Sequence, residues 1–428
     1  MKLTLNARTT PLLGTYRPAG DKSLSHRALL LGALAEGESV VERFLVSGVT
    51  RAMLHCLSAL GVAWTIDEAQ TLRVHGRGLH GFLPSSQPLY CGNSATTFRL
   101  LAGALAGAGI PAILTGSEGL SKRPMDRIVT PLRAMGAKLS DTQGCAPIVF
   151  SSATLRGITY AQPVASAQVK SCLILAALSA QTPSTFTEPG PSRDHTERML
   201  LSMGAKIEMA PGRVTVFPQI VPLQPLQTAL AGDISSAAFL MVAASILPNS
   251  DFLLERVGIN PTRTGILDVL RRMGADITIE HEGEMAGEPV ADIRIRYAAL
   301  HGTHVSGDEV VRMIDEFPAL MIAAACADGE TVVREAAELR TKESDRLAIM
   351  TTELRRIGIT MDEYPDGFRI VGGKGIFGNT TCQAQGDHRV AMSLILAGLV
   401  AQHPMTIEGA EIIQESFPDF TSVLGLER

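Results

Sequence analysis

Six copies of one pattern, a helix end followed by glycine, recur along the 428-residue chain at intervals of roughly 70 residues. Each copy is typical of an amphipathic helix that a glycine stops, because glycine adopts positive φ at little steric cost. A short β-prone segment follows in the first five copies. The segments are LSALGVAW, LRAMGAKL, LLSMGAKI, LRRMGADI, LRRIGITM and SVLGLE, with Gly61, Gly136, Gly204, Gly274, Gly358 and Gly425.

A second, very apolar helix is predicted once in each period. Each begins at a small polar residue, whose side chain is expected to accept a hydrogen bond from an otherwise unpaired backbone N–H. Helices that are apolar on every face are buried on every face. The predicted caps are Asp21, Asn93, Ser166, Asp233, Asp315 and Asp387. A turn and a strand follow most of these helices, so one period predicts a β-α-β-α-β-β unit.

Six such units predict an α/β protein of two domains, with three repeats sharing the core of each. The chain is also too long for one ordinary core. We place the boundary near Gly232, where proline and glutamine interrupt the pattern in PLQPLQTALAG. If the buried helices are parallel, their N-termini meet at one cleft, and their partial positive charges would attract an anion.

Composition excludes several classes of partner. A net charge of −5 argues against nucleic acid or an anionic membrane surface. No run approaches the ~18 apolar residues that span a bilayer, so a cytoplasmic protein without a membrane segment is expected. Six scattered cysteines predict buried thiols. His301 and His304 have no further ligand nearby, which indicates surface histidines and no metal site.

Cations lie at helix starts where they oppose the helix dipole. Lys22 and Arg27 occupy the first start, and Arg99, Lys170 and Arg389 occupy three others. A solvated, salt-bridged helix start would explain one such case. Recurrence at four of six equivalent positions favours a site for small anions, since a buried unpaired charge is costly.

Three loop segments add further charges. SKRPMDR contains Arg123, PSRDHTERML contains Arg193, and LRTKESDR contains Lys342, Glu343 and Arg346. None has the G-x-x-x-x-G-K-[ST] spacing of a nucleotide P-loop.

These segments, taken in order, closely resemble the 5-enolpyruvylshikimate-3-phosphate synthase family over nearly the whole chain. The resemblance implies a two-domain inside-out α/β barrel, the enolpyruvyl transferase fold, which closes around its substrates. Residues 20–232 would form the first domain, and residues 1–19 and 233–428 the second, with the active site in the interdomain cleft. The matching segments are GDKSLSHRALLLGAL, GNSATTFRLLAG, SKRPMDR, ASAQVKS, SRDHTERML, IDEFPAL, RTKESDRL and GDHRVAM.

The implied reaction transfers the enolpyruvyl group of phosphoenolpyruvate to the 5-hydroxyl of shikimate 3-phosphate and releases phosphate. It passes through a tetrahedral intermediate by addition and elimination. Both substrates carry a carboxylate and a phosphate, which accounts for clustered cations in an acidic protein. The resemblance implies no metal and no cofactor, and a monomer is expected.

Residue by residue, the resemblance assigns Lys22 to both substrates. It assigns Ser23 and Arg27 to the carboxylate and hydroxyl side of shikimate 3-phosphate, and Arg193 to its phosphate. Ser166, Ala167 and Gln168 match the segment that meets the phosphate and the ring. The phosphoenolpyruvate contacts match Arg123, Gln168, Glu343, Arg346 and Arg389, with Asn93 and Ala95 lining the same pocket.

Addition and elimination require a base at the 5-hydroxyl and an acid at the methylene carbon of phosphoenolpyruvate. Asp315, with Lys342 beside the hydroxyl, is the matched candidate for the first role, and Glu343 for the second. Lys22 is a candidate for either role.

Three positions depart from the best-known branch of the family. Ala95 stands where that branch has glycine, Ala167 replaces a second serine, and Glu415 replaces a lysine before FPDF. These changes resemble the branch called class II, which tolerates glyphosate. We therefore expect tolerance, because the Ala95 methyl group would crowd the longer inhibitor.

Three alternatives stay open at this point. The sister enolpyruvyl transferase acting on UDP-N-acetylglucosamine has a cysteine in the loop corresponding to TGSEGLSKRPMDR, and this chain has none there. An RNA-end-processing protein on a related fold would need basic and aromatic residues interleaved. A noncatalytic sugar-phosphate binder would have no need of Asp315 and Glu343.

Overall fold

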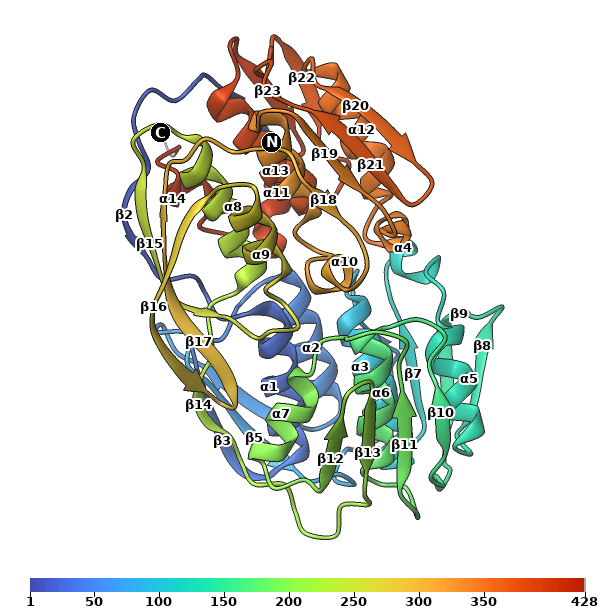
Figure 1. The fold of residues 1–428 in the computed structure, drawn as a ribbon. Helices are drawn as coiled ribbons and strands as arrows, with labels where there is room; N and C mark the ends of the chain where they lie inside the picture. Colours follow the sequence, from blue (N-terminus) through green and yellow to red (C-terminus); the bar gives the residue numbers. More distant parts are fainter. Residues whose placement is uncertain (427–428) are drawn as a thin grey trace. The chain divides into compact units, whose positions relative to one another are not determined.

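The structure is a computed structural model that describes residues 1–426, and the chain divides into two compact units (Figure 1). The first unit contains residues 19–231 and the short segment 284–288. The second contains residues 1–18, residues 232–283 and the chain from Pro289 onward. The segment 284–288 had no signal in the sequence, because a hairpin tip differs little in composition from any other turn.

Three buried helices form the centre of the first unit and lie side by side (Figure 1). Leucine and alanine cover all their faces, so nearly every residue beyond the first turn is buried, as predicted. They are α1 (Lys22–Leu34), α3 (Ala95–Ala108) and α6 (Ala167–Ala177). The other helices are α2 (Gly48–Ala59), α4 (Glu118–Ser121), α5 (Asp126–Ala134) and α7 (His195–Ser202).

The described strands of this unit form three sheets of one design. In each sheet, one outer strand (β14, β6 or β10) is parallel to its neighbour, and the remaining pairs are antiparallel. Their orders are β14–β3–β5–β4, β6–β7–β9–β8 and β10–β11–β13–β12. The strands are β3 (Glu36–Glu42), β4 (Ala63–Ile66), β5 (Leu72–Arg77), β6 (Leu89–Tyr90), β7 (Ala112–Thr115), β8 (Lys138–Thr142), β9 (Cys145–Ser151), β10 (Thr159–Ala161), β11 (Ser184–Thr187), β12 (Ile207–Ala210), β13 (Arg213–Val216) and β14 (Gln227–Ala229).

The second unit repeats this plan. Its central helices pack on one another in one hydrophobic core: α8 (Ile234–Ile246), α11 (Phe317–Cys326) and α13 (His388–Val400). Around them are α9 (Gly265–Arg272), α10 (Asp308–Arg312), α12 (Arg346–Arg356), α14 (Phe420–Val423) and the 3₁₀ helices η1 (Ala337–Thr341) and η2 (Ala410–Glu415).

The described sheets of the second unit have the orders β16–β17–β15–β2, β18–β19–β21–β20 and β1–β23–β22. The strands are β1 (Lys2–Leu5), β2 (Leu13–Tyr16), β15 (Asp251–Gly258), β16 (Asp276–Met285), β17 (Glu288–Arg296), β18 (His304–Val305), β19 (Glu330–Val333), β20 (Thr360–Tyr364), β21 (Gly367–Val371), β22 (Thr380–Gln383) and β23 (Met405–Glu408).

The predicted β-α-β-α-β-β repeat is therefore confirmed, with one exchange of strands between repeats that falls within the domain bounds implied by the family resemblance. Strand β2 precedes α1 in the chain but pairs in parallel with β15 of the second unit. Strand β14, which precedes α8, pairs in parallel with β3 of the first unit. Strand β1 completes the sixth sheet by pairing antiparallel with β23.

The predicted helix stops are also confirmed. All six glycines of the repeated pattern have positive φ, between 65° and 99°. Residues with a side chain rarely adopt this backbone region, so glycine at these positions lets the chain turn into the following segment.

Two of the predicted caps are wrong. Helix α3 is capped by Ser94, whose hydroxyl accepts the Thr97 N–H at 3.1 Å, and not by Asn93. Helix α11 begins after Glu316 with a proline in its first turn, so Asp315 lies outside the helix. Asp21, Asp233 and Asp387 cap their helices as predicted. Ser166 occupies the cap position of α6 without a side-chain bond.

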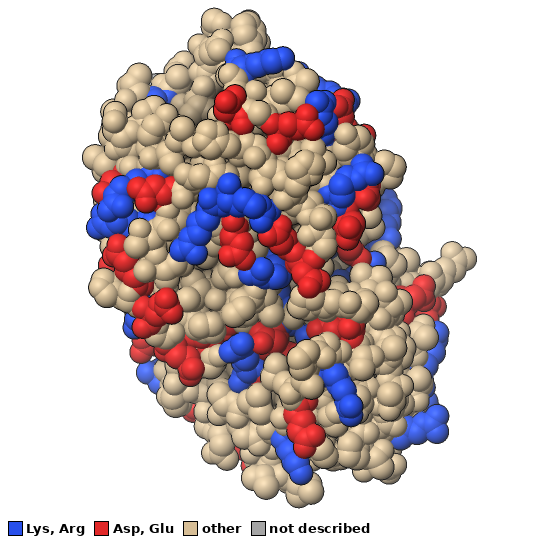
Figure 2. Space-filling model, in the orientation of Figure 1, with Lys and Arg blue, Asp and Glu red and all other residues tan. Residues whose placement is uncertain are grey.

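Several smaller predictions can be compared with the structure. The six cysteines are free thiols, four of them buried. His301 and His304 are exposed, as expected of surface residues. Among residues 1–426, no helix combines the length and hydropathy that a bilayer span requires. Lys and Arg alternate with Asp and Glu on the face that Figure 2 shows.

Candidate active site

The N-terminal turns of the three central helices lie together in the first unit. The His26 ring in α1 is 3.4 Å from the hydroxyl of Ser94, the cap of α3. Gln168 in α6 donates to the Thr96 hydroxyl in α3 at 2.9 Å. Because three positive dipole ends meet here, the first unit gathers partial positive charge before any side chain is counted.

Lys22 and Ser23 occupy the first turn of α1, where both are half-buried. The Lys22 carbonyl is 2.8 Å from Nδ1 of His26. The pKa of His26 is lowered to about 4, chiefly by burial, and the nearby Lys22 and Arg27 charges act in the same direction. His26 is therefore neutral at pH 7, and the true cations of this helix start are Lys22 and Arg27.

Arg27 joins three helices and is only 3% exposed. Its Nε donates to the Thr196 hydroxyl of α7 at 2.7 Å, and its Nη2 donates to the Ser171 hydroxyl of α6 at 2.9 Å. Its Nη1 donates to the Ser23 carbonyl at 3.0 Å. Its pKa is lowered to about 10, chiefly by burial; Glu197 opposes this shift, and the Arg193 cation acts in the same direction as burial. Arg27 and Arg193 thus lie close enough to repel each other.

Gln168 is held by two residues of α3. Arg99 donates to its Oε1 at 2.6 Å, while its Nε2 donates to Thr96. Arg99 also donates to the Pro124 carbonyl at 3.4 Å, next to Arg123 in the following loop. This arrangement fixes the orientation of the Gln168 amide, with its oxygen toward a cation.

The remaining predicted residues of the first unit line the same helix starts. Ala95 is buried as the first residue of α3, while Asn93 is exposed and accepts from the Ser117 hydroxyl at 3.1 Å. Ser166 and Ala167 are half-buried at the start of α6. Within residues 1–426, no hydrogen bond or ion pair engages the Arg123 guanidinium. We call Lys22, Ser23, Arg27, Asn93, Ala95, Arg123, Ser166, Ala167, Gln168 and Arg193 the first cluster.

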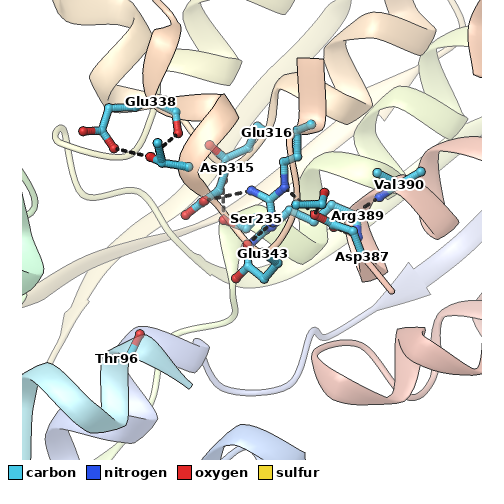
Figure 3. Close-up of polar contacts among 12 residues, drawn as sticks. Thr96, Ser235, Asp315, Glu316, Glu338, Glu343, Asp387, Arg389 and Val390 are labelled. Carbon is cyan, nitrogen blue, oxygen red and sulfur yellow. Dashed lines mark hydrogen bonds and ion pairs between the residues drawn. The ribbon is translucent and has the colours of Figure 1, made fainter. Parts of the chain in front are cut away.

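In the second unit, the carboxylates of Asp315, Glu343 and Asp387 lie together (Figure 3), and all three pair with Arg346. It is 1% exposed and pairs with Asp387 at 2.8 Å, with Glu343 at 2.6 Å and with Asp315 at 3.4 Å. Burial alone would lower its pKa, but these three charges outweigh burial and leave the pKa raised. Arg346 thus remains a cation whose neighbours are the two acids that the sequence proposed for proton transfer.

Asp387 anchors this arrangement. It is fully buried, caps α13 and accepts from Arg346 and from the Ser344 hydroxyl at 2.9 Å. Burial raises the pKa of Asp387, but the Arg346 charge outweighs burial and leaves the pKa lowered. The sequence identified Asp387 only as a cap, because its pairing with Arg346 spans 41 residues of chain.

Lys342 and Arg389 complete the second cluster, which we define as Asp315, Lys342, Glu343, Arg346 and Arg389. Burial lowers the pKa of Lys342, although the Asp315 charge opposes this. Arg389, at the start of α13, is 4% exposed. In the described chain, neither cationic group has a hydrogen-bonded or ion-paired protein partner, so both have donors left for an anion.

The helix starts of α8 and α11 also meet in this unit. Ser235 donates to Glu316, and the buried Arg263 donates to Ser235 at 2.7 Å and pairs with Asp233 at 3.1 Å. Helix α8 itself is a buried helix capped by Asp233. Arg263 lies in a separate segment, GINPTRTGI, which the sequence patterns did not single out.

Part of the LRTKESDR segment forms an ordinary salt-bridged helix start. Arg340 pairs with Asp345 at 2.9 Å, and Asp345 caps α12 by accepting the Ala348 N–H. Thr96, Ser171 and Thr196, which hold Gln168 and Arg27, were not identified from the sequence. Their only signal was a hydroxyl side chain within a helix, which is too common to indicate a site.

Comparison with known proteins identifies the family of this chain. The family model described as EPSP synthase (3-phosphoshikimate 1-carboxyvinyltransferase) matches residues 7–424. The chain is 48% identical over 419 residues to the 3-phosphoshikimate 1-carboxyvinyltransferase of Synechococcus sp. (strain JA-3-3Ab), covering 96% of this chain and 94% of the relative. The enzyme of the same name from Citrifermentans bemidjiense is 47% identical over 415 residues, 96% of each chain.

Solved structures show the same fold. An EPSP synthase from Acinetobacter baumannii superposes with a TM-score of 0.89 at 43% identity, over 99% of this chain and 97% of that one. The enolpyruvyl transferase NikO from Streptomyces tendae superposes with a TM-score of 0.80 at 18% identity, again over 99% and 97% of the two chains, and supports the fold alone.

Proposed function

Because this chain belongs to the EPSP synthase family, in which it acts as a 3-phosphoshikimate 1-carboxyvinyltransferase, we propose how its two clusters of charged side chains carry out that reaction. The enolpyruvyl group of phosphoenolpyruvate passes to the 5-hydroxyl of shikimate 3-phosphate, and phosphate leaves. In this proposal, residues of both units hold one pair of substrates.

The first cluster binds shikimate 3-phosphate. Arg27 and Arg193 repel each other across a short distance, so an anion between or beside them is stabilised. Lys22, Ser23, Ser166 and Gln168 add donors at converging helix N-termini, where phosphate binds favourably. Lys342 and Asp315 of the second cluster meet the 5-hydroxyl of the same substrate.

Phosphoenolpyruvate is held by Arg346 and Arg389, with Arg123, Gln168, Lys22, Asn93 and Ala95 from the first cluster. Guanidinium groups suit its carboxylate and phosphate through paired N–H donors. The guanidinium groups of Arg389 and Arg123 have no hydrogen-bonded or ion-paired protein partner among the described residues, and Arg346 has carboxylate neighbours that position it.

Proton transfer is assigned to the acids beside Arg346. Asp315 takes the 5-hydroxyl proton as the oxygen attacks C2 of phosphoenolpyruvate, and Glu343 delivers a proton to C3. This gives the tetrahedral intermediate. In elimination, Glu343 recovers a proton from C3, the double bond re-forms, and phosphate departs with the proton that Asp315 had taken, so both acids return to their starting states. Lys22 stays a candidate for either transfer. The observation that carries this proposal is the pairing of both acids with one buried arginine.

The test is turnover of Asp315→Asn and Glu343→Gln, followed as phosphate release from phosphoenolpyruvate in the presence of shikimate 3-phosphate. Loss of a general acid or base should lower kcat by about 10²–10⁴-fold while shikimate 3-phosphate still binds. Glu330→Gln is the control, since Glu330 pairs with Arg369 outside the cluster. Near-normal turnover in either variant would refute the role of that acid.

We also propose a cytoplasmic monomer. The free state of all six cysteines supports a reducing compartment. Light scattering at micromolar concentration gives the mass directly, and a dimer would contradict this part of the proposal.

A further inference from the structure

We propose that Lys170 is a positioning residue for the phosphate group of shikimate 3-phosphate, acting by fixing the loop that carries Arg193. This inference rests on the proposed function. Lys170 belongs to α6, four residues after the Ser166 cap, and all the residues involved lie in the first unit.

Lys170 is buried, and its ammonium group is fully engaged. The residue is 5% exposed. Its Nζ pairs with Glu188 at 2.8 Å and with Glu197 at 3.0 Å, and it donates to the Ser192 carbonyl at 3.4 Å. An ammonium group has three N–H donors. Since three acceptors use them, Lys170 has no donor left for a substrate, which distinguishes it from a binding residue.

The ion pair between Lys170 and Glu188 fixes a loop. Residues 188–194 connect β11 to α7 with the sequence EPGPSRD. The Glu188 carboxylate accepts the Ser192 N–H at 3.3 Å and the Ser192 hydroxyl at 2.5 Å. The loop is thus closed on its own carboxylate, and that carboxylate is anchored to Lys170. Arg193 follows directly, so its backbone position depends on this anchor.

The ion pair between Lys170 and Glu197 connects Lys170 to Arg27 through α7. Glu197, in the first turn of α7, is 1% exposed and pairs with Lys170. Its charge also acts on Arg27, whose Nε is held by the adjacent Thr196. Ser171, next to Lys170 in α6, bonds both Arg27 and Thr196. One lysine therefore fixes the segment that carries Arg193 and the helix turn that holds Arg27.

Charge shows why lysine is needed here. Burial alone would lower the pKa of Lys170, but Glu197 and Glu188 outweigh it and leave the pKa raised. Without the ammonium group, two carboxylates would be buried with no cation between them. Such a pair is released toward water, because a buried unpaired charge is strongly unfavourable. The loop and Arg193 would move with Glu188.

The test compares Lys170→Met and Lys170→Arg with wild type, using the full chain. KM for each substrate, kcat and the preference for shikimate 3-phosphate over unphosphorylated shikimate are measured. For Lys170→Met we expect KM for shikimate 3-phosphate to rise about tenfold or more, as a displaced binding group commonly causes. The phosphate preference should fall by a similar factor, with KM for phosphoenolpyruvate unchanged within about twofold. Lys170→Arg should recover part of the loss.

Two further variants keep the test decisive if Lys170→Met does not fold. Ser192→Ala removes only the hydroxyl bond to Glu188 and should raise KM for shikimate 3-phosphate about threefold, in proportion to one hydrogen bond. Glu353→Gln alters a buried carboxylate of the second unit and should leave this KM unchanged.

Equal changes in both KM values, or an unchanged phosphate preference in Lys170→Met and Ser192→Ala, would overturn the positioning role. Failure of the proposed function itself would look different, because wild-type protein would then release no phosphate from phosphoenolpyruvate when shikimate 3-phosphate is added.

Discussion

At the scale of single residues, we expect the Ala95 methyl group to let the site accept phosphoenolpyruvate and to weaken the binding of glyphosate. Ala95 is 8% exposed and is the first residue of α3, directly after the Ser94 cap. Its methyl group has little room to move, because the helix start fixes the backbone and Ser94 is bonded to Thr97. In the proposed phosphoenolpyruvate site, a longer ligand would meet this methyl group as a rigid contact, which is the physical reason for the glyphosate tolerance that we predict.

We predict that Ala95→Gly lowers the inhibition constant for glyphosate by about tenfold or more, which corresponds to relief of ~1–3 kcal/mol of overpacking. KM for phosphoenolpyruvate should change less than the inhibition constant does. Inhibition measured at fixed phosphoenolpyruvate checks this. Ala108→Gly, at the other end of α3, controls for the loss of helix propensity. An unchanged inhibition constant in Ala95→Gly would contradict the role of the methyl group.

At the scale of elements, the starts of the buried helices are joined to one another by hydrogen bonds between side chains. In the first unit they are joined through His26 and Ser94 and through Gln168 and Thr96; in the second, through Ser235 and Glu316. These junctions require neutral or correctly charged side chains, because the helix starts are buried. The neutral state of His26 is one such requirement.

His26 therefore predicts a loss of stability in mild acid. Its pKa is about 4 in the folded protein and about 6.5 when unfolded. Since the unfolded chain takes up the proton first, this contribution is complete above pH 6.5 and is lost as the pH falls toward 4. Between pH 7.5 and 5.0 the loss should be about 2 kcal/mol. Urea unfolding of wild type and His26→Gln at both pH values checks this: the variant should lose about 2 kcal/mol less. Equal losses would show that His26 is already charged or exposed.

Local sequence patterns predict the helices and their ends better than they predict contacts between distant segments. The repeats, their stop glycines and the all-buried helices were predictable, because each depends on local periodicity or on backbone conformation. The caps at Ser94 and Glu316 were mispredicted by one residue, since neighbouring polar residues compete for the cap. The pairing of Asp387 with Arg346 depends on a contact between distant segments that no local pattern records. The exchange of β2 and β14 also depends on distant contacts, and only the family resemblance, which assigned residues 1–19 to the second domain, implied it.

At the scale of the whole molecule, three repeats in each unit produce one cluster of charged residues per unit. The first contains Arg27, Arg193 and the helix starts around Gln168; the second contains Arg346 with its carboxylates. Neither unit alone supplies every group that the proposed reaction uses, because the proposed acids Asp315 and Glu343 belong to the second unit and the proposed phosphate ligand Arg193 to the first. Our central claim is that both units bind the same molecule of shikimate 3-phosphate.

Binding of shikimate 3-phosphate to Arg193→Met and Lys342→Met, measured by titration calorimetry, tests this claim most directly. Each variant removes one cation, from the first and the second unit respectively, and Lys138→Met removes an exposed cation of β8 as a control. We predict that both site variants bind at least about tenfold more weakly, as expected for loss of a charge-assisted hydrogen bond. The control should bind as wild type does. Wild-type affinity in Lys342→Met, with weakened binding in Arg193→Met alone, would contradict the claim that both units hold this substrate.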